Sequence, residues 1–237
     1  MLASSASLVV GERGTYAQDI QTGQDATGDA ATRPVKRSYK GREIAVTMHY
    51  LGAPWLMRDT RQREEDCALL LKTLDVKPGQ TVCDIGCGNG FYSLQLAELV
   101  GPAGKVLAVD IQPEMLHMLA ERAREANVAN IETIEGTETD PKLPDGAVDL
   151  ILLVDVYHEF SHPAGMLKAM RRALKPDGRI ALAEFRLEDR HVPIKLLHKM
   201  SKKQILKEFT PNGFKLVDAF DKLPWQHLMF FSGTNNP

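Results

Sequence analysis

The chain has 237 residues, of which 43% are hydrophobic and 25% are charged, and its 29 basic and 31 acidic residues give a formal net charge of −2. This balance is typical of a globular enzyme and argues against a nucleic-acid partner bound through a basic surface. The three cysteines, Cys67, Cys83 and Cys87, fit neither a disulfide framework nor the paired spacing of a zinc site. We therefore expect no metal and a reducing compartment, the cytoplasm.

Residues 1–38 have no hydrophobic periodicity and are predicted to form a disordered N-terminal segment. An apolar stretch at residues 2–10 is short and follows no basic residue, so export through a degenerate signal is the minor alternative. No stretch approaches the length of a membrane-spanning helix, and no membrane partner is expected.

Residues 39–74 are predicted to form an N-terminal helical cap. Ile44, Met48 and Leu51 share one face at helical spacing, and a second helix is expected over residues 61–74.

A β-type run at residues 81–85 leads into a glycine-rich turn and then into a helix that begins at Phe91. Gly86, Gly88 and Gly90 alternate in this turn, where the missing Cβ atoms allow a ligand to lie against backbone N–H groups. The dinucleotide fingerprint fails, because Phe91 stands where it requires a third glycine. Asp84, two residues before the first glycine, suits a ligand with an amino group better than a pyrophosphate.

A second buried strand, residues 106–110, ends in Asp110, placed to accept hydrogen bonds from two ribose hydroxyls. With this acid following Asp84-x-Gly86-x-Gly88-x-Gly90, the chain resembles the class I S-adenosylmethionine-dependent methyltransferases over about residues 75–232, and residues 75–237 are expected to form the methyltransferase domain. The resemblance implies S-adenosylmethionine as the cofactor and an α/β fold, with a Rossmann-like, mostly parallel seven-stranded sheet that ends in an antiparallel hairpin.

The cofactor residues that the resemblance implies are the acid before the turn, the turn itself, the ribose acid and the residue after it. They are Asp84, Gly86, Cys87, Gly88, Gly90, Asp110 and Ile111, with Ile111 against the adenine. A third landmark, residues 135–149, departs from the family, since Thr137 stands where an aspartate usually binds the adenine amino group and the acid follows at Glu138. Both residues are kept as cofactor candidates.

The apolar run at residues 150–154 is typical of a central parallel strand, and polar residues follow at its carboxyl end. Ligands of open α/β sheets bind at this edge, which makes Asp155 a cofactor candidate and Tyr157, His158 and Glu159 catalytic candidates. The alternative is that one or two of these residues only pack or cap the next helix.

The remaining elements follow the family order. Ser161 is predicted to cap a helix, residues 178–185 to form a strand, residues 201–209 a helix, and residues 214–220 and 225–231 the terminal hairpin. By resemblance, the cap and the long connection after residue 185 supply the acceptor pocket, with His49, Tyr50, Trp55 and His198 as substrate candidates.

We interpret the chain as an enzyme that transfers a methyl group to a small-molecule acceptor by in-line displacement. Two alternatives stay open. One is a cofactor-binding module with a different or no reaction, and the other is an RNA, DNA or protein methyltransferase. If a homodimer forms, the terminal hairpin and the N-terminal helices are the expected surfaces.

Overall fold

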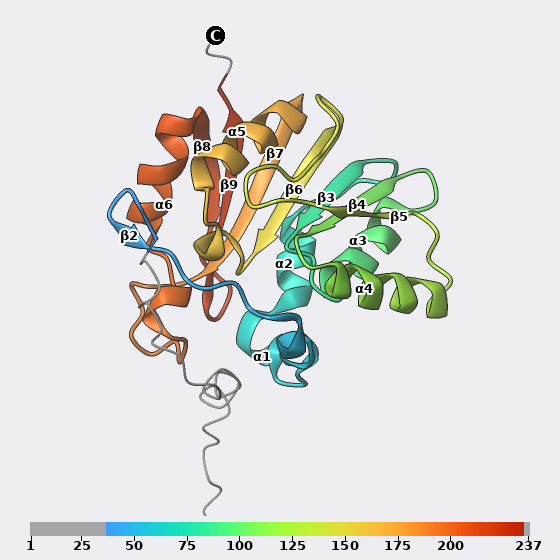
Figure 1. Cartoon of the computed structure of the whole chain (residues 1–237), viewed down its shortest axis with the longest axis horizontal. Coiled ribbons are helices and arrows are strands. Elements are labelled where there is room, and N and C mark those ends of the chain that lie inside the picture. The colour runs from blue at the N-terminus through green and yellow to red at the C-terminus, as the bar shows by residue number, and fades with distance from the viewer. Residues whose placement is uncertain (1–36, 235–237) are drawn as a thin grey trace, which may run out of the picture. The chain divides into compact units, whose positions relative to one another are not determined.

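The computed structural model describes residues 37–234. All but two residues of the segment predicted to be disordered, 1–38, therefore lie outside the described residues. The described part is a mixed α/β fold built around a seven-stranded sheet with the strand order β5-β4-β3-β6-β7-β9-β8 (Figure 1). These strands are β3 Thr81–Ile85, β4 Lys105–Asp110, β5 Ile131–Glu135, β6 Val148–Val154, β7 Leu174–Phe185, β8 Phe214–Phe220 and β9 Gln226–Gly233.

The strands of the sheet are parallel except at one edge, where β9 pairs antiparallel with both β7 and β8. This arrangement confirms the predicted fold class. Because β3 lies between β4 and β6, the turn after β3 meets the carboxyl ends of both neighbours at one edge of the sheet. The sequence elements that carry the candidate site are thus brought together by the strand order.

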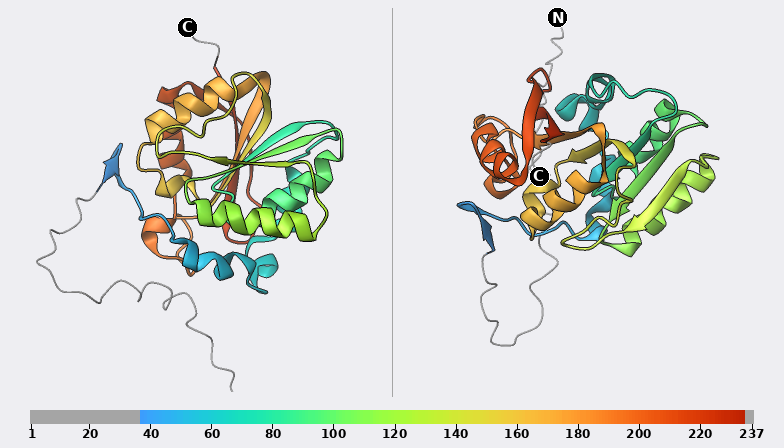
Figure 2. Two further views of the ribbon diagram at one scale, coloured as in Figure 1. Left: turned by 45° about the vertical axis from the view of Figure 1, so that its right-hand side comes forward. Right: turned by 90° about the horizontal axis from the view of Figure 1, so that it is seen from above.

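Helices cover both faces of the sheet, as Figure 2 shows from two further directions. They are α1 Arg61–Glu65, α2 Cys67–Thr73, α3 Phe91–Val100, α4 Pro113–Glu125, α5 Pro163–Ala173 and α6 Lys202–Phe209. Side chains of α2 and α3 pack on one face with Leu150 and Leu152 of β6, while α5 and α6 pack on the other with Ile151 and Leu153. Successive β6 residues thus face opposite layers, which explains its unbroken apolar run.

The N-terminal region differs from the predicted pair of helices. A short hairpin, β1 Ser38–Tyr39 and β2 Arg42–Glu43, precedes an extended stretch and then the 3₁₀ helix η2 Tyr50–Met57. In the extended stretch, the N–H of Ala45 donates to the carbonyl of His158 at 3.2 Å. Such contacts with distant parts of the chain outweigh the helical spacing of the apolar residues. We call residues 44–50 the strap.

Two further local predictions need correction. The helix expected over residues 61–74 breaks at Asp66, which adopts a left-handed conformation (φ 50°) and caps α2 by accepting from the N–H of Leu69. Ser161 does not cap α5, because its hydroxyl donates to Glu138 instead, and His162 is the first flanking residue. Within residues 37–234, no helix is both long and apolar enough to cross a membrane.

Candidate active site

The glycine turn after β3 has a backbone that only glycine adopts easily. Gly86, Gly88 and Gly90 have φ angles of 70°, 53° and 83°. A Cβ at Gly86 would lie 2.3 Å from a methyl of Val156, and one at Gly90 would lie 2.1 Å from a methyl of Leu119. Each glycine is therefore required both by its conformation and by the close approach of a neighbour. Cys87, between them, is buried, and burial raises the pKa of its thiol.

Asp110 is positioned by backbone amides at the end of β4. One carboxylate oxygen accepts from the N–H of Gly88 and the other from the N–H of Gln112, both at 3.0 Å. Burial raises the pKa of Asp110, and these two amide contacts oppose that rise. Each carboxylate oxygen can accept a second bond, so the amides orient the group and leave it able to accept from two hydroxyls.

Asp84 lies beneath the turn and is 3% exposed. One of its oxygens accepts from the hydroxyl of Ser93 in α3 at 2.6 Å. Burial raises its pKa to about 6, although the Ser93 hydroxyl and the charge of Arg61 oppose the rise. The carboxylate thus contacts α3 as well as supporting the turn.

Beyond Asp110, the predicted adenine-side residues lie near the surface. Ile111 is 39% exposed, and the hydroxyl of Thr137 accepts from the N–H of Asp140 at 2.9 Å, closing a local turn. Glu138 is exposed and pairs with Arg37 at 3.2 Å. The Thr137 side chain therefore stabilises its own loop, while Glu138 holds the chain that leads into β1.

Asp155 follows β6 with a left-handed backbone (φ 50°). One of its oxygens accepts from the amide of Gln226 at 2.6 Å, while its other oxygen and the Gln226 oxygen are buried without a partner among the described residues. Burial raises the pKa of Asp155 well above its usual range. Two buried acceptors that lack a donor suit a ligand carrying an ammonium group, as the predicted cofactor does.

His158 is the centre of a second cluster, at the carboxyl ends of β6 and β7. It belongs to the 3₁₀ turn η3 Tyr157–Glu159 and is 2% exposed. Its Nδ1 lies 2.7 Å from Glu184 of β7, and its own N–H donates to the other Glu184 oxygen at 3.1 Å. Burial disfavours the imidazolium, but the charge and hydrogen bond of Glu184 raise the pKa of His158 overall.

The Nε2 atom of His158 faces two further candidates. His198 Nδ1 lies 3.1 Å away, and a carboxylate oxygen of Glu159 lies 3.8 Å away. Burial raises the pKa of Glu159 to about 7, with the charge of Asp110 among the smaller contributions. Burial and the charge of His158 lower the pKa of His198 to about 4. The Nε2 atom of His158 thus lies between a second imidazole and a carboxylate.

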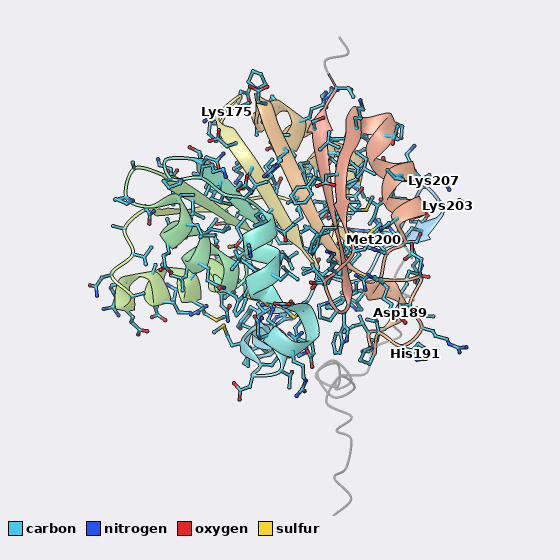
Figure 3. The ribbon with its side chains drawn as sticks, turned by 180° about the vertical axis from the view of Figure 1, so that it is seen from behind. Lys175, Asp189, His191, Met200, Lys203 and Lys207 are labelled. Carbon is cyan, nitrogen blue, oxygen red and sulfur yellow. The ribbon has the colours of Figure 1, made fainter. Side chains whose placement is uncertain are left out.

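His198 comes from η4 Leu196–His198, in the connection after β7. The buried side chain of Lys199 donates to the carbonyls of Asp189 and Val192, and the N–H of Met200 donates to Phe185 at 2.9 Å. In Figure 3, Asp189 and His191 lie at the end of the sheet opposite Lys175. These contacts hold the connection at the carboxyl ends of the strands, and His198 lies there.

Tyr157 does not join this cluster. It is fully buried in the hydrophobic core, its ring packs against Phe160 and Phe209, and its hydroxyl donates to Glu208 at 2.9 Å. Of the three catalytic candidates, the structure therefore brings together His158 and Glu159 and turns Tyr157 away into the core.

The strap links the two clusters. The N–H of Met48 donates to both oxygens of Glu159 at 3.3 Å, and the N–H of Tyr50 donates to the side chain of Gln112 at 2.8 Å, two residues after Asp110. The predicted lid residues lie at its end: His49 caps η2, Tyr50 contacts the His49 ring, and Trp55 stacks on Arg58. Figure 1 shows this segment passing the strand ends between β2 and α1.

Sequence reasoning missed Glu184, Gln226 and Arg42. The guanidinium of Arg42 donates to the carbonyl of His158 at 2.8 Å and pairs with Glu208 at 2.9 Å. A signal for Glu184 does exist, because it is the single acid in the apolar run predicted as a strand at residues 178–185. Such a pattern indicates a carboxylate that is buried and therefore partnered. Gln226 and Arg42 carry no comparable signal, because their partners are distant in sequence.

Comparisons with known proteins agree with this geometry. Residues 76–229 match a family model described as a methyltransferase domain. The chain is 29% identical over 167 residues, 68% of its length, to the ubiquinone/menaquinone biosynthesis C-methyltransferase UbiE of Ectopseudomonas mendocina. It is 34% identical over 113 residues, 48% of its length, to the nocamycin O-methyltransferase of Saccharothrix syringae. The matches span 65% and 40% of these relatives, respectively.

Among solved structures, an S-adenosylmethionine-dependent methyltransferase from Aquifex aeolicus superposes with a TM-score of 0.73 at 26% identity. The superposition covers 78% of this chain and 98% of that structure. The similarity therefore extends far beyond the glycine turn.

Proposed function

The chain belongs to the class I S-adenosylmethionine-dependent methyltransferases, and from this premise we propose that it methylates a small-molecule acceptor with an ionisable hydroxyl group by in-line displacement. One observation carries the proposal: the His158 and Glu184 pair, with Glu159 beside it, is buried at the sheet edge that also carries the glycine turn. Titratable groups with shifted pKa values gather at functional sites, and this cluster lies at the edge where open α/β sheets bind their ligands.

The cofactor residues are assigned from the contacts described above. Asp110 would accept from the ribose hydroxyls, and the turn from Gly86 to Gly90 would lie against the cofactor. The Asp155 oxygen that has no partner within residues 37–234 would accept from the ammonium group. When bound, S-adenosylmethionine supplies a methyl group made electrophilic by the sulfonium. The protein's task is to hold the acceptor in line and to keep water out.

The acceptor is assigned to the side of β6 and β7. We propose that His158 and Glu159 contact its hydroxyl and favour the ionised form, because an oxygen anion is the stronger nucleophile. The relatives support an acceptor of this kind, since one is named a quinone-pathway C-methyltransferase and the other an O-methyltransferase. An ionised hydroxyl can react at oxygen or, when it is conjugated to a ring, at carbon.

The alternatives predict different behaviour. A regulatory module would bind the cofactor without forming S-adenosylhomocysteine from any acceptor. A macromolecular methyltransferase would require a charged or extended docking surface, and the net charge of −2 gives no support for a nucleic-acid substrate.

The first experiment is calorimetric titration of the purified chain with S-adenosylmethionine and S-adenosylhomocysteine, with NAD as the control ligand. We expect both sulfur ligands to bind and NAD not to bind. Asp110→Ala should weaken binding at least about 100-fold, because two hydrogen bonds to a charged group together contribute about 3 kcal/mol or more. Equal affinity in the parent and the variant would contradict the ribose assignment.

The second experiment screens phenols, hydroxyquinones and aliphatic alcohols for the formation of S-adenosylhomocysteine. His158→Ala should lower kcat and leave cofactor affinity unchanged, because its contacts lie on the acceptor side. If the parent binds the cofactor but turns over none of these acceptors, the proposed acceptor class is wrong.

A further inference from the structure

Three potential metal ligands converge beside the proposed acceptor position. His158, Glu159 and His198 each offer one nitrogen or oxygen atom, and these atoms all lie within 4.8 Å of one another. Two histidines and one carboxylate form a ligand set common in catalytic metal sites, which keep a further coordination position open. The cluster contains no cysteine and unites two separate parts of the chain, so neither cysteine spacing nor any local motif indicates it.

The separations match those around a small metal ion. Nitrogen ligands about 2.1 Å from a tetrahedral ion lie about 3.4 Å from each other. The His158 Nε2 atom is 3.1 Å from His198 Nδ1 and 3.8 Å from a Glu159 oxygen, values on either side of that distance. Small side-chain rotations would therefore place all three atoms around one ion.

Glu184 supplies the outer contact that metal-binding histidines usually have. It is fully buried and lies 2.7 Å from Nδ1 of His158. A carboxylate there accepts a hydrogen bond from Nδ1–H, which keeps the proton on Nδ1 and leaves the lone pair of Nε2 directed at the other two ligands. This arrangement fixes both the tautomer and the orientation of the ring before any ion binds.

The local charge also favours a cation. Two carboxylates flank the His158 ring, Glu184 at 2.7 Å from Nδ1 and Glu159 at 3.8 Å from Nε2. Two largely buried arginines of this region each pair with another acid. Arg42 binds Glu208 at 2.9 Å, and Arg61 binds Glu65 at 2.8 Å. Buried acids in excess are stabilised when a positive ion lies among them.

We propose that His158, Glu159 and His198 bind a divalent transition metal ion of the zinc type, with Glu184 orienting His158. With the ion bound, its open position would take a water or an oxygen of the acceptor, and the metal, in place of direct contacts from His158 and Glu159, would lower the pKa of that oxygen. Only this last role rests on the proposed function, because the binding of the ion needs neither cofactor nor acceptor.

The test uses the untagged full-length chain after chelator treatment. Co²⁺ is added as a probe with visible absorption, and Zn²⁺ is then used to displace it. We expect one Co²⁺ per chain, with the intense bands of a four-coordinate site and without thiolate bands. The three buried cysteines are not part of the cluster. No cobalt spectrum and no calorimetric signal with Zn²⁺ would overturn the proposal.

Variants locate the ion. His198→Ala should abolish the cobalt bands, and Glu184→Gln should weaken Zn²⁺ binding about 10- to 100-fold, the usual effect of losing an outer carboxylate. The control is His117→Ala, which removes an exposed histidine 3.4 Å from Glu121 and should change nothing. Thermal unfolding of each variant checks that it is folded. Retention of the bands in His198→Ala would overturn the assignment.

Cofactor titration of the same chelated protein separates this proposal from the proposed function. Binding of S-adenosylmethionine without metal binding would overturn the metal site alone. Metal binding without cofactor binding would support the metal site and contradict the cofactor assignments.

Discussion

The two halves of the site are built in different ways. On the cofactor side, the glycine turn adopts a left-handed backbone, and Asp110 accepts from the backbone amides of Gly88 and Gln112. On the acceptor side, His158 is held by the side chains of Glu184 and His198, which lie 26 and 40 residues away. Because every residue but proline offers a backbone amide, the cofactor half is marked in the sequence by its glycines and its strand-end acid alone, whereas the acceptor half depends on which side chains the fold brings together.

The largest loss of stability should come from adding one carbon atom to the glycine turn of the cofactor half. Gly90→Ala places a Cβ 2.1 Å from Leu119 at a φ of 83°, and we expect a loss of about 4 kcal/mol in the free energy of unfolding from backbone strain and overpacking. Urea unfolding measures this loss.

The matched control is Gly79→Ala, because Gly79 has a φ of 84° and no atom of the described part of the chain lies within 4 Å of the added carbon. It should cost only the strain, about 1 to 2 kcal/mol. Equal losses in the two variants would show that the contact with Leu119 contributes nothing.

A smaller change in stability, which depends on pH, should follow from replacing Asp84. Burial raises the pKa of Asp84 to about 6 from 3.8. A raised carboxyl pKa contributes stability that is complete below the unfolded pKa and is lost as pH rises through the folded one. Asp84→Asn does not ionise, so its free energy of unfolding relative to the parent should rise by about 2 to 3 kcal/mol between about pH 4 and about pH 8.

Chemical unfolding at several pH values measures this difference. Ser93→Ala provides the comparison, because it removes the hydroxyl that lowers the Asp84 pKa and should move the midpoint of the change to higher pH. A difference between Asp84→Asn and the parent that does not vary with pH would mean that Asp84 is not desolvated as described.

The smallest effect concerns the acceptor half. Tyr157→Phe removes the hydroxyl that donates to Glu208, while Arg42 still pairs with that acid. We expect a loss of about 1 kcal/mol in stability and a kcat within about twofold of the parent. Steady-state kinetics with an acceptor found in the screen measures this, and a tenfold loss would return Tyr157 to the catalytic residues.

Prediction from the sequence succeeded mainly for the cofactor half of the site and less well for the acceptor half. The sheet, the glycine turn and the position of Asp110 were readable because strand runs, glycines and a terminal acid are local signals. The prediction of a helix through Ile44 and Met48 was wrong, because the N–H groups of the strap donate to Glu159 and to other residues distant in sequence. Local spacing carries no information about such partners.

His158, Glu159 and Tyr157 illustrate the limit within one short motif. Their place at the end of β6 was predictable, but the direction of each side chain depends on which partner the fold brings near. Glu184 reaches His158 because β7 pairs in parallel with β6, and Glu208 reaches Tyr157 from α6. The local sequence thus predicts where these residues lie, but the role of each depends on partners from other parts of the chain.

The hydrogen bonds of the strap offer a direct way to follow catalysis in solution. Its N–H groups at Ala45, Met48 and Tyr50 each donate to a different part of the site: the His158 carbonyl, the Glu159 carboxylate and the Gln112 side chain. Their rates of hydrogen–deuterium exchange therefore report separately on the two halves. Cofactor binding should slow exchange first at Tyr50, and acceptor or metal binding should slow it at Met48, so the order of ligand entry can be read from two backbone protons.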